Sequence, residues 1–280
     1  MSHFSLPDWL RIILAVLSCA SFVPQLYVLV IRRGNTSGIS LTYVLLNLIV
    51  ATELFAISFF YTVNKVQRYD LFVHKPPNAG DWINLANFAV IWVLWLVIFL
   101  ICLVPFGREN PWLATVAVVM VYAFVLWISL VPLVDDAFFH RYPNEPSDDW
   151  RWVDIMYHHV HALIITPVTT LLALPAFLVQ ARAILARPPG SGTGALSLQG
   201  LALQAVVFAV LAATWLPGRL VYPEPTGSIA WCWFLGLVPV DHALFALEQA
   251  LLVAVAGWHR RRERSDEIGV SDETQPLIAS

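Results

Sequence analysis

The sequence predicts an all-α integral membrane protein whose seven transmembrane helices form two parallel triple-helix bundles joined by a connector helix. Three observations lead to this fold class. Of the 280 residues, 59% are hydrophobic and only 12% are charged, and the mean hydropathy is +0.70, whereas soluble domains carry about 25% charged residues. Seven long apolar runs follow one another along the chain. The runs before and after the fourth share a weak repeat.

The seven runs are each long enough to cross the hydrocarbon core of a bilayer as a helix. They cover Trp9 to Ile31, Ile39 to Val63, Ile83 to Val104, Trp112 to Val134, Ile155 to Leu185, Ala195 to Leu216 and Ile229 to Trp258. The first run has no basic segment before it and continues unbroken to Ile31, so we interpret it as a retained span rather than a cleaved secretory signal. We therefore expect the chain to contact lipid and no nucleic acid.

An internal repeat relates the first three spans to the last three. Aligning the two copies pairs Gln25 with Gln180, Arg32 with Arg187, Ser40-Leu41 with Ser197-Leu198, and Asn47 with Gln204. An unpaired fourth span lets both triplets enter the membrane in the same direction, which places a binding cavity between parallel halves. We expect a first repeat over residues 1–104, a connector with an acidic lumenal loop over 105–152, a second repeat over 153–258, and a disordered tail over 259–280.

The distribution of Lys and Arg predicts a lumenal N-terminus and a cytoplasmic C-terminus. With this orientation nine basic residues fall on the cytoplasmic side and seven on the other. The basic residues that directly follow spans 1, 5 and 7 all lie on the cytoplasmic side, as the positive-inside rule requires. These are Arg32, Arg33, Arg187 and the cluster Arg260, Arg261, Arg262 and Arg264.

A proline inside the first span predicts a hinge. Pro24 removes one backbone hydrogen bond and leaves a carbonyl that another group must satisfy. The neighbouring Gln25 can be that partner, so we interpret Pro24 as the hinge and Gln25 as its latch, with a static packing kink as the alternative. Gln180 is the counterpart of Gln25, but Val179 stands where a second proline would be. The first half is therefore expected to bend more than the second.

The stretch "VPQLYVLVIRRGNTSGIS" carries Pro24-Gln25, the basic pair Arg32-Arg33, and a Gly-Ile-Ser restart of the next helix. It resembles the signature of the PQ-loop repeat family of seven-span membrane transporters, which includes lysosomal and vacuolar amino-acid exporters and is related to the SWEET sugar transporters. The second copy, Val179-Gln180, is degenerate. The resemblance implies export of a small solute, a cationic or neutral amino acid, from a vacuole-like or lysosome-like compartment by alternating access, without a cofactor.

Polar side chains deep in the spans are the candidate binding residues for solute or protons, because each must face the bundle interior or a wet cavity. They are Asn47, Glu53, Asn84, Asn87, Gln204, Asp241 and Glu248. Asp241 and Glu248 are seven residues apart and share one helix face, which suits proton coupling or a cationic group on the solute. Asp241 is expected nearest the middle of its span. The alternative for each acid is a hydrogen bond to a neighbouring helix.

Two shorter patterns remain. His158 and His161 have a spacing compatible with metal binding, but no third ligand is evident, so we expect interfacial histidines and no metal site. Near the C-terminus, Glu273 followed by Leu277 and Ile278 resembles an acidic dileucine sorting signal. That signal would bind a cytoplasmic adaptor and direct the protein to a vacuolar or lysosomal membrane.

Two other function classes are open from the sequence. A membrane-embedded terpene-cyclase-like enzyme would use one Glu and one Asp within the membrane, and Glu53 with Asp241 could be that pair. The internal repeat and the Pro-Gln pair are not expected of such an enzyme, so we expect no enzymatic activity. A receptor-like protein is the third class, but a retinal protein is disfavoured because Lys65 and Lys75 lie in one loop outside the spans.

Overall fold

The computed structural model describes residues 6–32, 35–63, 72–74, 76–109, 112–138, 152–188, 194–218 and 237–273. The described elements are all helices, and seven helical segments are long and apolar enough to cross a membrane, which confirms an all-α protein with seven candidate spans. The division into two triplets and a connector stays a prediction. The helices are α1 (Asp8–Ile31), α2 (Leu41–Val63), α3 (Ala79–Glu109), α4 (Trp112–Ser129), α5 (Val131–Phe138), α6 (Trp152–Ile155), the π-helix η1 (Met156–Ile165), α7 (Thr166–Leu171), α8 (Ala173–Leu185), α9 (Leu198–Gly218) and α11 (Leu237–Glu273).

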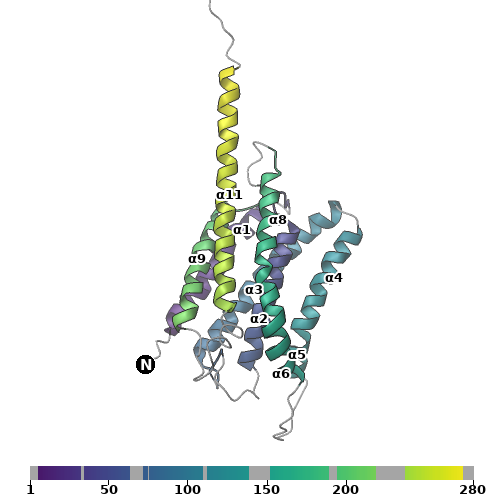
Figure 1. Ribbon diagram of the computed structural model, residues 1–280, viewed down its shortest axis with the longest axis vertical. Coiled ribbons are helices and arrows are strands. Elements are labelled where there is room, and N and C mark those ends of the chain that lie inside the picture. Colours follow the sequence, from purple (N-terminus) through teal and green to yellow (C-terminus); the bar gives the residue numbers. More distant parts are fainter. Residues whose placement is uncertain are drawn as a thin grey trace, which may run out of the picture.

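Successive spans alternate in direction, so the bundle has two ends (Figure 1). The Arg32 end carries the turn between α1 and α2 and the segment between α8 and α9. The Asp81 end carries the starts of α1, α3 and α11. Helix α3 begins there with a capping box, in which the Asp81 N–H donates to Oδ1 of Asn78 and the Asn78 N–H donates to Oδ2 of Asp81, both at 3.0 Å.

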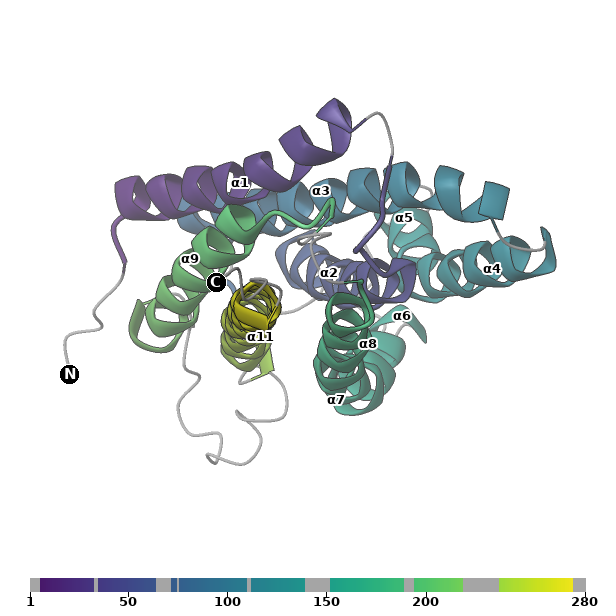
Figure 2. The ribbon, with the colours of Figure 1, turned by 90° about the horizontal axis from the view of Figure 1, so that it is seen from above.

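The packing of the helices repeats between the two halves. Helix α3 contacts both α1 and α2, and α11 contacts both α9 and α8. Between the halves, α1 contacts α9 and α2 contacts α8. Helix α4 contacts α2 and α3 and lies at the side of the bundle away from α9 and α11 (Figure 2). The most apolar stretch of α2 is 78% buried and that of α4 only 22%, so α2 is central and α4 offers most of its surface to lipid.

Between the two triplets of spans, the described departures from regular α-helix occur in the second. Helix α1 continues through Pro24 to Ile31 without interruption. The fifth span instead contains the π-helix η1 and a change of helix at Leu172. Pro167, the second residue after η1, has no N–H to donate to the preceding turn, which weakens the α-type ladder at that point. The irregular backbone thus lies in the second triplet, whereas Pro24 predicts the greater bend in the first.

Helix α11 extends beyond the other helices at the Arg32 end (Figure 1). It continues to Glu273, whereas the sequence analysis predicts a disordered tail from residue 259. Residues 259–273 contain no proline and several Arg and Glu residues, which are good helix formers, so the transmembrane helix propagates into the polar segment. Leu277 and Ile278 of the expected sorting signal lie outside the described residues, and Glu273 is the last residue of α11.

Candidate functional site

At the Arg32 end, the side-chain amide of Gln25 binds backbone of the opposite half. Its Nε2 donates to the Ala195 carbonyl at 2.9 Å, and its Oε1 accepts from the Ser197 N–H at 2.8 Å. Gln25 lies in the last two turns of α1, whereas Ala195 and Ser197 immediately precede α9. From the sequence, this amide is expected to bind the carbonyl freed by Pro24. In this conformation the amide instead forms both of these hydrogen bonds with the segment that precedes α9.

Gln180 makes the same contact in the other direction. Its Nε2 donates to the Gly38 carbonyl at 2.8 Å, and its Oε1 accepts from the Ser40 N–H at 2.9 Å. Gly38 and Ser40 stand at the positions that the repeat aligns with Ala195 and Ser197. The two glutamines therefore form a reciprocal pair of clasps, one contributed by each half. The predicted equivalence of Gln25 and Gln180 appears here as equivalent hydrogen bonds.

The two clasped turns also touch each other. The Ala195 N–H donates to the Ser37 carbonyl at 2.8 Å. Beside it, Gly194 has a φ of +63°, and a Cβ at that position would lie only 2.0 Å from the Ser37 carbonyl oxygen. A side chain here would meet rigid backbone, so only glycine fits. The Arg32 end is thus closed by backbone contacts that require both glutamines and this glycine.

Below the clasps, both halves line a central cavity. The space open to the centres of water molecules is about 40 Å³, room for a few waters. Its polar lining includes Asn47 on α2 and both Asp241 and Glu248 on α11, as the seven-residue spacing of the two acids predicts. Its apolar walls include four aromatic side chains, Phe88, Trp95, Phe208 and Phe245. The cavity therefore combines carboxyl groups with aromatic rings.

Asp241 and Glu248 share the cavity with the basic side chain of His242, and the described residues that line it include no Lys or Arg. Asp241 is 5% exposed and lies beside Thr170, and its Oδ2 has no hydrogen-bond partner within the described part of the chain. Glu248 is 3% exposed and lies beside Asn47, and neither of its carboxylate oxygens has a well-aligned partner in the same described ranges. The cavity thus contains unused acceptors for a cation or a proton.

The depths of the two acids are described from Leu237 onward. From that residue, Asp241 lies about 6 Å along the axis of α11 and Glu248 about 16 Å. Within the described part of the span, Leu237–Arg262, Glu248 is nearest the middle. The expected start of the span at Ile229 lies outside the described residues, so the mid-span position of Asp241 stays a prediction.

A smaller cavity lies towards the Arg32 end. Gln25 and Gln204 line it together with Tyr43, whose hydroxyl donates to Oε1 of Gln249 at 3.0 Å. Trp95 lines both cavities, so its indole separates the acidic cavity from the clasps. The sequence analysis identifies Gln204 but not Trp95, because one aromatic among twelve tryptophans has no sequence feature that distinguishes it from an interfacial anchor.

Glu53 lies outside both cavities in a separate buried cluster. Nδ1 of His161 is 2.8 Å from Oε1 of Glu53, and the hydroxyls of Thr166 and Ser129 donate to the same carboxylate at 3.3 and 3.1 Å. The Tyr157 hydroxyl donates to the Ser129 carbonyl. From the sequence, His161 is expected at the membrane interface, but it is fully buried. Its contact with Glu53 could not be inferred from the sequence, because the two residues are more than a hundred positions apart along the chain.

The other predicted residues are not brought into the central cavity. Asn84 and Asn87 on α3 are buried, but neither lines the acidic cavity or the smaller one. His158 is half-buried, and its Nδ1 lies 2.9 Å from the Asp154 carbonyl. Within the described ranges, no three His, Cys, Asp or Glu side chains are grouped to hold a metal ion.

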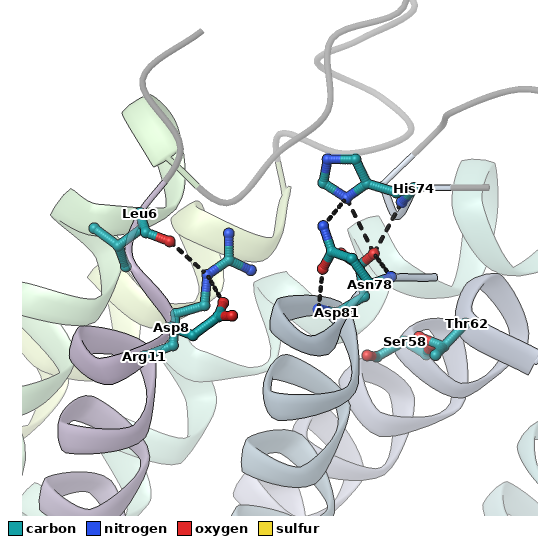
Figure 3. Close-up of polar contacts among 8 residues, drawn as sticks. All are labelled: Leu6, Asp8, Arg11, Ser58, Thr62, His74, Asn78 and Asp81. Atoms are coloured by element: carbon teal, nitrogen blue, oxygen red, sulfur yellow. Dashed lines mark hydrogen bonds and ion pairs between the residues drawn. The ribbon is translucent and has the colours of Figure 1, made fainter. Parts of the chain in front are cut away.

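The Asp81 end has its own polar network (Figure 3). Oδ2 of Asp81 accepts from the His74 N–H and lies 3.0 Å from Nδ1 of the same histidine. Nearby, Nε of the buried Arg11 donates to the Leu6 carbonyl at 3.1 Å and lies 4.0 Å from Oδ1 of Asp8. These contacts anchor the start of α3 and the start of α1.

Comparison with known proteins identifies one family. Residues 6–67 match the family model of the PQ-loop repeat, the segment that contains α1, the clasped turn and α2. No curated protein and no solved structure matches the chain. The matched segment contains Pro24 and Gln25, which carry the resemblance noted in the sequence. The chain is therefore a seven-span helical membrane protein that contains a PQ-loop repeat at residues 6–67.

Proposed function

We propose that the protein is a small-solute transporter that exports a cationic or neutral amino acid from an acidic, vacuole-like or lysosome-like compartment. The observation that carries this proposal is the central cavity, in which Asp241 and Glu248 lie among aromatic side chains and no Lys or Arg is among the described lining residues. Carboxylates attract the ammonium group that every amino acid carries, and ring faces stabilise cations and apolar side chains. The PQ-loop match supports transport in general.

Alternating access would proceed by opening one end of the bundle at a time. The repeated packing of the helices supports a 3+1+3 division into parallel halves with α4 as connector. The reciprocal clasps of Gln25 and Gln180 would act as the gate at the Arg32 end, since an open pathway there requires the two turns to separate. Pro24, one residue before the first clasp, is the proposed hinge.

The orientation and location rest on charge and on a short motif. The basic residues Arg260, Arg261 and Arg262 follow the last span directly, which favours a cytoplasmic C-terminus by the positive-inside rule. The Arg32 end would then be cytoplasmic and the Asp81 end lumenal. An adaptor that recognises Glu273, Leu277 and Ile278 would direct the protein to the vacuolar or lysosomal membrane.

An enzymatic role has less support. A cyclase-like reaction at Glu53 and Asp241 needs an open pocket on both acids. Glu53 is 1% exposed and its carboxylate is already bound by three side chains. Asp241 alone of the two lines the central cavity. The family match also favours transport over catalysis and over a receptor-like role.

The experiment that tests the proposal is solute flux in proteoliposomes that contain the full chain. Radiolabelled lysine and leucine would represent the cationic and neutral classes. We expect uptake of at least one of them, and a loss of ten-fold or more in Asp241→Asn and in Glu248→Gln, because each substitution removes a charge from the cavity. Asp135→Asn is the matched control, since Asp135 on α5 lines neither cavity. Equal solute flux in protein-free liposomes and in proteoliposomes would contradict transport of these solutes.

A further inference from the structure

We propose that Glu53 and His161 form the proton-binding site of this transporter, separate from the solute site at Asp241 and Glu248. The inference rests on the proposed transport function and names its coupling ion. It also divides the acids of the bundle into two roles. Glu53 would carry the proton with its histidine, and the cavity acids would bind the solute.

The pair is built for one exchangeable proton. Glu53 and His161 are 1% and 0% exposed and lie 2.8 Å apart. The remaining partners of the carboxylate, Ser129 and Thr166, are neutral hydroxyls. An isolated buried carboxylate is costly unless it is paired or protonated. With the exchangeable proton bound, the pair is an imidazolium with a carboxylate, and its charges balance. After loss of that proton, a neutral imidazole still donates from Nδ1 to the carboxylate, and one negative charge stays buried.

The π-helix is what brings both second-half ligands to Glu53. His161 and Thr166 both contact Oε1 of Glu53, and they are five residues apart. In a regular α-helix, positions i and i+5 point about 140° apart. In η1 the Thr166 N–H donates to the His161 carbonyl, the i to i+5 pattern of a π-helix, which brings these two positions to one face. Such π segments occur frequently at functional sites.

The imidazole is held firmly but retains one unused nitrogen. The ring of Tyr157 stacks on it with the centroids 4.2 Å apart and the planes nearly parallel, and the Tyr157 hydroxyl is fixed on the Ser129 carbonyl. Nε2 of His161 is buried and has no hydrogen-bond partner in the described part of the chain. This nitrogen is where a proton can be gained or lost without breaking the contact between Nδ1 and Glu53.

The proton site is linked to the cavity through one helical turn. Thr166 donates to Glu53, the Thr170 hydroxyl donates to the Thr166 carbonyl at 2.9 Å, and Thr170 lines the cavity beside Asp241. The charges of Glu53 and Asp241 are close enough to interact. A cationic group bound at Asp241 would therefore change the electrostatic energy of the Glu53–His161 pair, and protonation of the pair would change solute binding by the same amount.

Other titratable groups lie on the elements packed around the pair. Tyr157 is one of them, and its ring stacks on His161. Others are Tyr61 on α2, Tyr122 on α4, Asp241, His242 and Glu248 on α11, Asp81 on α3, Asp135 and Asp136 on α5, Asp154 on α6, and His158 and His159 on η1. Among the described residues, no Lys or Arg contacts the Glu53 carboxylate, so His161 is the basic side chain that contacts it. His158 is the closest matched control, one turn away on the same helix.

Transport coupling is the first test. Proteoliposomes with the membrane potential held at zero would receive a pH gradient of one unit, and labelled lysine or leucine would be measured as accumulation and as equilibrium exchange. One coupled proton gives about ten-fold accumulation per pH unit. We expect this in the wild type and in His158→Gln. We expect no accumulation in Glu53→Gln and His161→Asn, with exchange within about three-fold of the wild type. Ten-fold accumulation in both variants would overturn the proposal.

Infrared difference spectra on purified protein after a pH step provide a readout independent of transport. The wild type should show a carboxyl and an imidazole band that titrate together, and each single variant should lose both. Asn at position 161 keeps an amide donor for Glu53, which preserves the hydrogen bond but not the titration, and Ser129→Ala should keep both bands. If the wild type transports neither lysine nor leucine, the proposed transport function is refuted, and the infrared bands still test the proton site separately. If the bands persist in Glu53→Gln and His161→Asn, the proposed proton site is refuted.

Discussion

Replacing Gln180 by alanine removes both hydrogen bonds of one clasp and should loosen the turn that precedes α2. The two bonds, to the Gly38 carbonyl and from the Ser40 N–H, are each worth about 1 kcal/mol net. Their loss should therefore destabilise the closed Arg32 end by about 2 kcal/mol. Since 1.4 kcal/mol corresponds to a factor of ten, the population with this end open should rise about 30-fold.

Cys102 is a native reporter of that opening. It is 2% exposed and lines a pocket together with Gly38 and Ile39 of the clasped turn. With Cys19 and Cys232 replaced by serine, maleimide labelling of Cys102 in detergent should be about 30-fold faster in Gln180→Ala, because the rate follows the open population when opening is fast. Gln199→Ala is the matched control, an exposed glutamine at the same end.

The outcome that would refute this reasoning is a labelling rate in Gln180→Ala within two-fold of that in Gln199→Ala. In that case the clasp would not hold the Arg32 end closed. A second comparison is with Gln25→Ala, which releases the other turn. Gln25→Ala should increase the labelling rate of Cys102 less than Gln180→Ala does, because Cys102 lies beside the turn that Gln180 binds.

Three further changes have expected results. Gly194→Ala should lower the thermal unfolding temperature by several degrees, because its Cβ would lie 2.0 Å from a backbone oxygen, whereas Gly257→Ala, with no neighbouring heavy atom within 4 Å, should leave it unchanged. Asp81→Asn should cost about 1 kcal/mol in thermal unfolding, because it removes the carboxylate that accepts from the His74 and Asn78 N–H groups at the start of α3. Trp95→Ala should join the two cavities and make proteoliposomes leaky to the solute, seen as faster uncoupled efflux.

The sequence predicts the fold well because the spans are local features. An apolar run of sufficient length must form a helix in lipid whatever its neighbours are, so all seven spans were identified. The expected start of the last span at Ile229 lies outside the described residues. The helical tail was missed because charge favours solvent exposure but does not by itself prevent a helix from continuing.

The candidate site is predicted only in part. Asn47, Asp241 and Glu248 were found because a polar group in a span must face the interior, but the same rule also selected Asn84 and Asn87, which face other parts of it. His161 was misjudged because its orientation depends on a π-helix, and the sequence pattern was interpreted with α-helical spacing. The partners of Gln25 were missed because local reasoning considers a proline and its neighbours along one helix.

The clasps have a consequence for which mutations the chain can tolerate. Each glutamine binds a carbonyl and an N–H of the opposite backbone, so the side chains at residues 38, 40, 195 and 197 contribute nothing to the contact itself. Small side chains other than serine should therefore be accepted at residues 40 and 197. Gly38 and Ala195 are restricted for other reasons, because Gly38 has a φ of +92° and Ala195 is fully buried. The absence of a proline before Gln180 fits this division, because the gate needs the amide and not the kink. The proline and the glutamine of the Pro-Gln pair can thus be substituted independently.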